Sequence, residues 1–91
     1  MTDDAVLRVD GAMTLCSAGE LLARHSVSEA VSAIDLSGVT EVDSAGLAVL
    51  VEWLRGAGRQ VPVVGAPASL RSLAELYDLE AALPFQNAPQ A

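Results

Sequence analysis

Asp43 and Ser44 are the residues of this sequence whose types and spacing suggest chemistry, because they stand together just before the apolar run AGLAVLVEWL. A serine becomes a nucleophile when a neighbouring base takes its proton, and that base is most often a histidine. The sequence holds one histidine, His25, and the string Val-Asp-Ser-Ala-Gly lacks the Gly-x-Ser-x-Gly pattern of a nucleophile turn. The residues therefore argue against an enzyme.

The same two residues have a structural interpretation, because Asp and Ser are side chains that commonly begin a helix. At the N-cap their oxygens accept a hydrogen bond from a free backbone N–H, which stabilises a protein by ~1 kcal/mol. A cap and a function are compatible, since the positive end of the helix dipole also tolerates a phosphate group on Ser44. From the residues alone, Ser44 is a cap, a phosphate acceptor or one point of a docking surface.

The charge of the chain restricts its partners. The sequence has five arginines, no lysine and twelve acidic residues, which gives a formal net charge of -7. Nucleic acid and anionic membrane surfaces require clustered cations, so we expect neither as a partner. The absence of lysine removes a P-loop lysine and Schiff-base chemistry, and no cofactor is expected. An acidic surface favours a protein partner with a basic face.

The cysteine content and the hydropathy pattern predict a cytoplasmic protein. The single cysteine, Cys16, allows no disulfide framework, and no His or Cys pair has the spacing of a metal site. The opening residues MTDDAVLR lack the features of a signal peptide. The longest apolar run, Ala45–Val51, is far shorter than the ~18 residues of a membrane span. The mean hydropathy of +0.40 still predicts apolar surface that meets a partner.

Hydrophobic periodicity and turn residues predict the order of the elements. Asp10-Gly11 is the signal of a tight hairpin, and Ser17 with Glu20 forms a capping box at the start of a helix. The first half should contain strands over Ala5–Val9 and Ala12–Cys16, a helix over Ala18–His25, a loop over residues 26–29, a strand over Ala30–Leu36 bounded by Ser37-Gly38, and a bend over Val39–Val42. The second half should contain a helix over Ala45–Arg55 closed by Gly56 and Gly58, a strand over Val61–Gly65, a helix over Pro67–Tyr77 and a turn that reaches Pro84.

These elements predict an α/β fold with one domain. We expect a small mixed four-stranded sheet flanked by three to four helices over residues 1–84, and a polar tail over residues 85–91. The strands over Ala30–Leu36 and Val61–Gly65 are joined through a helix, so they should be parallel, with a right-handed connection.

The central helix has more apolar residues than one buried face needs. At about 100° per residue, the face toward the core is expected to hold Leu47, Leu50, Val51 and Leu54. Val49 and Trp53 are left outside that face, either as a cover for the edge of the core or as part of a docking surface. The last long helix is expected to have an apolar face formed by Leu70, Leu73, Leu76 and Tyr77.

The string DLSGVTEVDSAGL, Asp35–Leu47, resembles the signature of STAS domains, the small α/β modules named for sulfate transporters and anti-sigma factor antagonists. The likeness covers thirteen residues in register, in the strand–loop–helix context expected above, and extends more loosely over residues 5–84. The segment CSAGELLARHSVSE departs from the pattern of the family's first helix.

The resemblance implies a non-enzymatic binding module, and two branches of the family compete. In anti-sigma factor antagonists, the serine that matches Ser44 accepts phosphate from a partner kinase. In the MlaB branch, the domain binds a cytoplasmic ABC transporter ATPase (MlaF-like) beneath an inner-membrane permease, in a system that moves phospholipid and maintains outer-membrane asymmetry. The ending SLAELYDLEAALP and the short chain favour the MlaB branch.

For this branch, the resemblance implies a contact at the start of the central helix. Asp43 would fix the loop by hydrogen bonding, whereas Ser44 would cap the helix and touch the ATPase. The expected partner-binding residues are Thr40, Glu41, Asp43, Ser44, Ala45, Ala48, Val49 and Glu52. The protein would lie at the inner membrane only through its partner, with no metal site and no segment inserted in the membrane.

Overall fold

The computed structural model describes residues 5–25 and 31–86. The elements in order are β1 (Ala5–Met13), α1 (Leu15–Arg24), β2 (Val31–Val42), α2 (Ser44–Ala57), β3 (Val63–Val64), α3 (Ala68–Leu76) and a 3₁₀ turn, η1 (Glu80–Ala82). The short turn predicted before Pro84 is confirmed as η1. The predicted loop over residues 26–29 lies outside the described residues.

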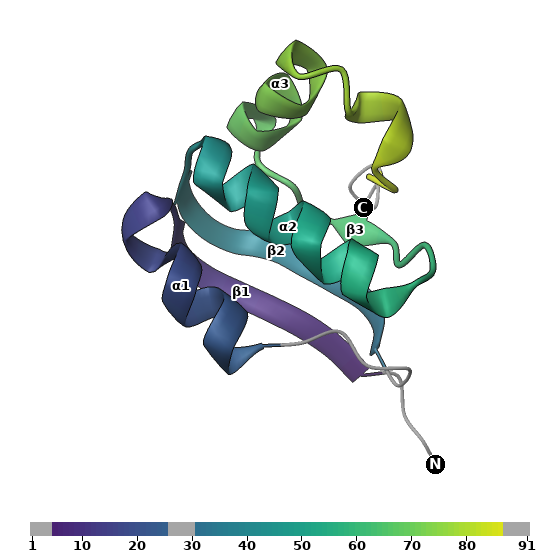
Figure 1. Ribbon diagram of the computed structural model, residues 1–91, viewed down its shortest axis with the longest axis horizontal. Helices are drawn as coiled ribbons and strands as arrows, with labels where there is room; N and C mark the ends of the chain where they lie inside the picture. Colours follow the sequence, from purple (N-terminus) through teal and green to yellow (C-terminus); the bar gives the residue numbers. More distant parts are fainter. Residues whose placement is uncertain (1–4, 26–30, 87–91) are drawn as a thin grey trace.

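The described strands form one three-stranded parallel sheet in the order β1-β2-β3. Leu7 is paired with Ile34, and Ile34 is paired in turn with Val63. Figure 1 shows α1 and α2 side by side across β1 and β2, with α3 on the other side of α2. The α/β class, the three helices and the parallel pairing of β2 with β3 are therefore confirmed, whereas a mixed four-stranded sheet is absent from the described residues.

The predicted hairpin at Asp10-Gly11 was wrong. Gly11 has a φ of 88°, but it sits within one continuous strand, and the register against β2 shifts on both sides of Asp10 and Gly11. A positive φ serves a bulge as well as a turn, and here the bulge bends β1 without reversing it. One misassigned turn thus produced both the extra strand and the expected antiparallel pair.

The first helix begins earlier than the capping box predicted. Thr14, not Ser17, is the residue before α1, so the expected strand over Ala12–Cys16 ends where the helix starts. The Ser17 hydroxyl accepts a hydrogen bond from the Thr14 N–H at 2.9 Å and donates to the Ala12 carbonyl at 2.8 Å. Ser17 therefore supports the first turn from inside the helix.

The second strand runs six residues past its predicted end at Leu36. It includes Ser37-Gly38, which was expected to bound it, and the expected bend over Val39–Val42. Gly38 is paired with Asp10, and a side chain at position 38 would collide with the Asp10 carboxylate. Gly38 therefore lets two strands approach, and it does not mark a turn. By contrast, β3 is shorter than expected, since Pro62 has no N–H with which to extend the ladder.

The core lies between the sheet and the helices, and the buried face of α2 matches the prediction only in part: Leu47 and Leu50 are buried as expected. Val49 is 1% exposed and Trp53 is 4% exposed, whereas Val51 and Leu54 are only half-buried. The indole N–H of Trp53 donates to the His25 carbonyl at 3.2 Å. The His25 ring lies edge-on to the indole, with 6.1 Å between the centres of the two rings. Since α1 covers one flank of α2, the buried face is rotated toward α1.

The last helix also turns fewer apolar residues inward than predicted. Leu70 and Ala74 are fully buried, but Leu76 is 74% exposed and Tyr77 is 53% exposed. The expected tail begins inside the described residues, because Phe85 forms a parallel bridge with Val63, while residues 87–91 lie outside them. No helix within the described ranges is long and apolar enough to cross a membrane.

Candidate functional site

Asp43 connects the starts of two helices. Its Oδ1 atom accepts hydrogen bonds from the N–H groups of Ala45 at 2.9 Å and Gly46 at 3.3 Å, which caps α2. Its Oδ2 atom accepts the N–H of Leu15 at 3.1 Å, at the first residue of α1. These bonds favour the carboxylate: the Leu15 N–H lowers the pKa of Asp43 most, and those of Gly46 and Ala45 add to the effect. Three hydrogen bonds thus support the expectation that Asp43 fixes the loop.

Ser44 is the first residue of α2 and is exposed. The cap is Asp43, so the predicted capping role of Ser44 was wrong. Within the described ranges the Ser44 hydroxyl makes no hydrogen bond with another side chain or with the backbone. The hydroxyl is therefore presented to solvent at the positive end of a 14-residue helix.

The surroundings of Ser44 do not resemble a catalytic site. His25 packs against Trp53, which lies nine residues along α2 from Ser44, and that spacing corresponds to about 13 Å. No group of three or more His, Cys, Asp and Glu side chains among the described residues could hold a metal ion. No histidine thus lies beside Ser44 in the described part of the chain, and the oxygens of the adjacent Asp43 accept backbone N–H groups.

Exposed apolar side chains gather around Ser44. Leu76 and Tyr77 line a shallow hollow together with Asp43 and Ser44. Leu15, which is 76% exposed, follows β1 and gives its N–H to Asp43. We call the surface formed by Ser44, Leu15, Leu76 and Tyr77 the Ser44 corner. Such a concentration of large apolar side chains around one exposed hydroxyl is typical of a protein-binding surface.

A groove continues from this corner along α2. Two hollows share Val51 and Leu79, so they form one depression between α2 and the segment that follows α3. We call it the α2 groove; its lining residues are Ser44, Leu47, Ala48, Val51, Glu52, Leu54, Arg55, Gly58, Arg59 and Gln60 on one wall, and Tyr77, Leu79, Ala82 and Leu83 on the other.

The predicted contact residues divide into three groups. Ser44, Ala48 and Glu52 are exposed and line the α2 groove. Thr40 and Glu41 are exposed near the end of β2, and Ala45 is half-buried. Val49 belongs to the core, so it is not available to a partner.

The structure adds apolar residues that the sequence reasoning had assigned to the core or passed over. These are Leu15, Val51, Leu76, Tyr77 and Leu79. One signal was present in the sequence: a helix needs a single buried stripe, and Leu70 with Ala74 already supplies one for α3. Leu76 and Tyr77 were therefore apolar residues that α3 did not need for its buried face.

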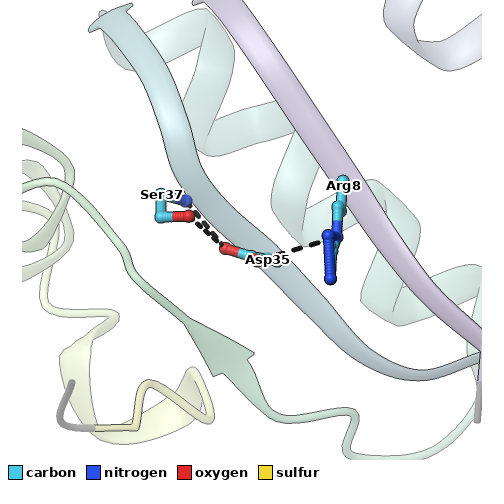
Figure 2. Close-up of polar contacts among 3 residues, drawn as sticks. All are labelled: Arg8, Asp35 and Ser37. Atoms are coloured by element: carbon cyan, nitrogen blue, oxygen red, sulfur yellow. Dashed lines mark hydrogen bonds and ion pairs between the residues drawn. The ribbon is translucent and has the colours of Figure 1, made fainter. Parts of the chain in front are cut away.

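A second polar cluster lies on the face of the sheet opposite α1 and α2, where Figure 2 shows Arg8, Asp35 and Ser37. The Asp35 Oδ1 atom accepts the Ser37 N–H at 2.9 Å and the Ser37 hydroxyl at 2.7 Å, and the Arg8 Nε lies 4.0 Å from Oδ2. The Ser37 N–H lowers the pKa of Asp35 most, followed by the hydroxyl, and Arg8 lowers it further. These groups satisfy one another.

The family model described as "Mlab, STAS domain" matches residues 1–84. No curated protein matches this chain.

Proposed function

Because the chain belongs to the MlaB-like STAS domain family, we propose that it is a non-enzymatic accessory subunit that binds the ATPase of an ABC-type phospholipid transporter. STAS domains are generally non-catalytic modules of regulation and interaction. In this proposal the protein is cytoplasmic and reaches the inner membrane through an ATPase that is bound to a membrane permease. The transport that it serves maintains the lipid asymmetry of the outer membrane.

The single observation that carries the proposal is the Ser44 corner. An exposed hydroxyl stands at the start of α2, and the exposed side chains of Leu76 and Tyr77 line the same hollow. Leu15, whose side chain is also exposed, is tied to this site through the hydrogen bond from its N–H to Asp43. Interfaces draw most of their binding energy from a few aromatic and aliphatic anchors that exclude water from a central polar group. Tyr77 and Leu76 supply such anchors, and they line the same hollow as Ser44 at the first residue of α2.

The mechanism is a population shift that needs no chemistry. A subunit that binds only the assembled or competent state of an ATPase stabilises that state by mass action. Asp43 serves this role indirectly: by bonding to both helix starts it holds Ser44 and Leu15 in one fixed arrangement before the partner arrives. A preformed surface binds more tightly because less ordering is needed on association.

The test is binding of the purified protein to the ABC ATPase from the same cells. Ser44→Arg places a bulky cation at the centre of the contact and should weaken binding at least about tenfold. Leu76→Ala should weaken it about fivefold or more, since it removes an anchor. Leu22→Ala is the matched control, because Leu22 is 42% exposed on α1 but lies two turns from the corner.

The melting temperature of each variant should stay close to that of the original protein, which separates lost contact from lost fold. The proposal fails if the purified pair does not associate at micromolar concentrations. It also fails if Leu22→Ala weakens binding as much as Leu76→Ala does.

A second function is favoured by the exposed hydroxyl itself. The protein would be an anti-sigma factor antagonist that is switched by phosphorylation of Ser44, whose oxygen has no bonding partner within the described residues. A phosphate group would add roughly -1.5 to -2 charges beside Asp43 and repel an acidic partner surface. Mass spectrometry of the protein from its native cells decides: stoichiometric phosphate on Ser44 in one growth state would favour the antagonist over the transporter subunit.

A further inference from the structure

We propose that the free edge of β1 pairs with β1 of a second copy of this chain, in an antiparallel register whose two-fold axis passes through Val9. The sheets of the two copies then join into one continuous sheet, and the protein forms a homodimer. This inference does not rest on the proposed function, because it concerns the edge of the sheet and uses no residue of the Ser44 corner or the α2 groove.

The two edges of the described sheet differ. At the β3 edge the chain covers its own strand: the Val63 N–H donates to the Pro84 carbonyl at 2.9 Å, and the Gln86 N–H donates to the Val63 carbonyl at 2.8 Å. By contrast, β1 has nine residues and pairs with β2 alone within the described sheet, where Figure 1 shows it as the purple strand at the lower edge. A long strand with one open side is a template for a further strand.

Arg8 and Asp10 carry backbone groups that point away from β2. The Val9 carbonyl points toward β2, because its oxygen lies 3.2 Å from the position that a Cβ atom on Gly38 would take. Successive residues of an extended strand direct their N–H and C=O groups to opposite sides, so those of Arg8 and Asp10 point outward from the sheet. A strand that approaches this edge therefore finds donors and acceptors at both positions.

The exposed side chains at these two positions have opposite charges. Arg8 and Asp10 line one small hollow together with Asp35, on the face of the sheet opposite α1 and α2. The Arg8 side chain is 66% exposed, and it approaches Asp35 only through its Nε atom, at 4.0 Å. Among the described residues, the Nη atoms of Arg8 and the carboxylate of Asp10 make no hydrogen bond. Both groups are thus open to a charge on another molecule.

The order of these charges selects one register. An axis through Val9 brings Arg8 of each copy opposite Asp10 of the other, and each such pair exchanges both of its N–H···O bonds. An axis through Arg8 or through Asp10 instead brings like charges together, which is unfavourable. Axes through Leu7 or Gly11 do not pair Arg8 with Asp10.

The charge pattern also identifies the occupant as a second copy. Charged side chains on an edge strand ordinarily keep other strands away. Here the two opposite charges are placed symmetrically about Val9, so the strand is complementary to itself, as an interface on a two-fold axis requires. Val6, which is 39% exposed, faces Ala12 of the other copy in this register and loses apolar surface to water. Two short strands bury less than about 1,200 Å², so the dimer is reversible.

Analytical ultracentrifugation of the full-length protein tests the proposal by exchange of charges. The original protein should dimerise as its concentration rises. Arg8→Asp alone and Asp10→Arg alone place like charges opposite each other, so each should weaken the dimer at least about tenfold. An equimolar mixture of these two variants should associate again, because one chain has Asp at both positions and the other has Arg.

The double variant Arg8→Asp with Asp10→Arg is the matched control, because it keeps the composition of the chain and restores both opposite-charge pairs. It should dimerise at least about fivefold more tightly than either single variant. Hydrogen exchange locates the contact: the amides of Arg8 and Asp10 should exchange more slowly as the concentration rises, whereas the amide of Val9, which faces β2, should change much less.

A protein that stays monomeric up to about 1 mM would overturn the inference. Single variants that dimerise as tightly as the original protein would do the same, as would a mixture of the two variants that fails to associate. A dimer that slows exchange around Leu76 and Tyr77 instead of β1 would place the junction at the Ser44 corner and also contradict the proposal. The ATPase binding test is separate, since neither substitution changes a residue of that corner.

Discussion

Two clusters with the same residue types lie eight residues apart in this chain, and they have opposite uses. Asp35 and Ser37 lie on the face of the sheet away from α1 and α2, and Gly38 lines the same small hollow. Asp43, Ser44 and Gly46 lie at the start of α2. In the first, the aspartate is bonded to its own serine. In the second, it is bonded to backbone N–H groups, and the serine is left open.

The difference shows that the partners of a carboxylate decide what a nearby hydroxyl can do. Asp35 takes both hydrogen bonds from a residue two positions away, so its cluster is closed and local. One bond of Asp43 comes from Leu15, which is 28 positions away. Asp43 therefore connects the start of α1 with the start of α2. Because backbone N–H groups occupy its oxygens, the Ser44 hydroxyl remains available to another molecule.

The largest effect should come from the glycines of the two clusters. A Cβ atom on Gly46 would collide with the Met13 carbonyl and lie 2.7 Å from the Val42 side chain. Gly46→Ala should therefore lower the free energy of unfolding by about 2–3 kcal/mol, measured by urea denaturation. Gly38→Ala collides chiefly with the movable Asp10 carboxylate and should cost less than about 1 kcal/mol. Equal losses in the two variants would contradict the comparison.

The next effect should come from the aspartates. Asp43→Ala removes the cap of α2 and the bond to α1, so Tm should fall by about 5–10 °C. Asp35→Ala removes bonds within one exposed turn, and Tm should fall by only about 1–4 °C. Asp43→Asn keeps one acceptor oxygen for α2, so its Tm should lie between those of Asp43→Ala and Asp35→Ala. The amides of α1 should exchange hydrogen faster in this variant than in the original protein. If Asp35→Ala has a lower Tm than Asp43→Ala, then Asp43 is not the aspartate that connects distant parts of the structure.

The same aspartates predict the acid dependence of stability. Both have a pKa lowered from the ordinary value of 3.8, so the folded protein binds their protons more weakly than the unfolded chain does. Their stabilisation is present above that value and is lost as the pH falls below it toward the lowered pKa. The melting temperature of Asp43→Ala should accordingly change less between pH 5 and about pH 2 than that of the original protein. If Tm falls by the same amount in both proteins over this pH range, the Asp43 carboxylate is not a source of the acid dependence.

The smallest effect should come from the serines. Ser37→Ala removes the hydroxyl bonded to Asp35 and should lower Tm by about 1–3 °C. Ser44→Ala removes a hydroxyl with no partner among the described residues, so Tm should change by less than about 1 °C. Calorimetry on matched samples measures both. A destabilised Ser44→Ala would mean that the hydroxyl supports the fold.

The sequence predicted best where a local signal and the tertiary structure agree. The signature Asp35–Leu47 led to the STAS family, and the helix that begins after Asp43 and ends near Gly58 was expected within a few residues. Asp43 begins this helix through hydrogen bonds to nearby N–H groups, and Gly58 ends it through a positive φ, so both signals are local in the sequence.

The errors arose where distant contacts decide. Gly11 signals a turn locally, but pairing with β2 continues on both sides of it, so β1 bends there without reversing. A helical wheel gives the width of the buried stripe of α2 and not its direction, which depends on how α1 covers Trp53. For the same reason, the exposure of Leu76 and Tyr77 could not be predicted from their helical spacing.

Trp53, the one tryptophan of the chain, is an optical reporter placed between α1 and α2. Its indole is 4% exposed and bonded to the last residue of the α1 segment, so detachment of α1 would shift its emission toward longer wavelengths. It does not line the α2 groove, and a ligand seated there would leave that emission unchanged. Intrinsic fluorescence can thus follow the integrity of the helix layer while a labelled partner reports occupancy.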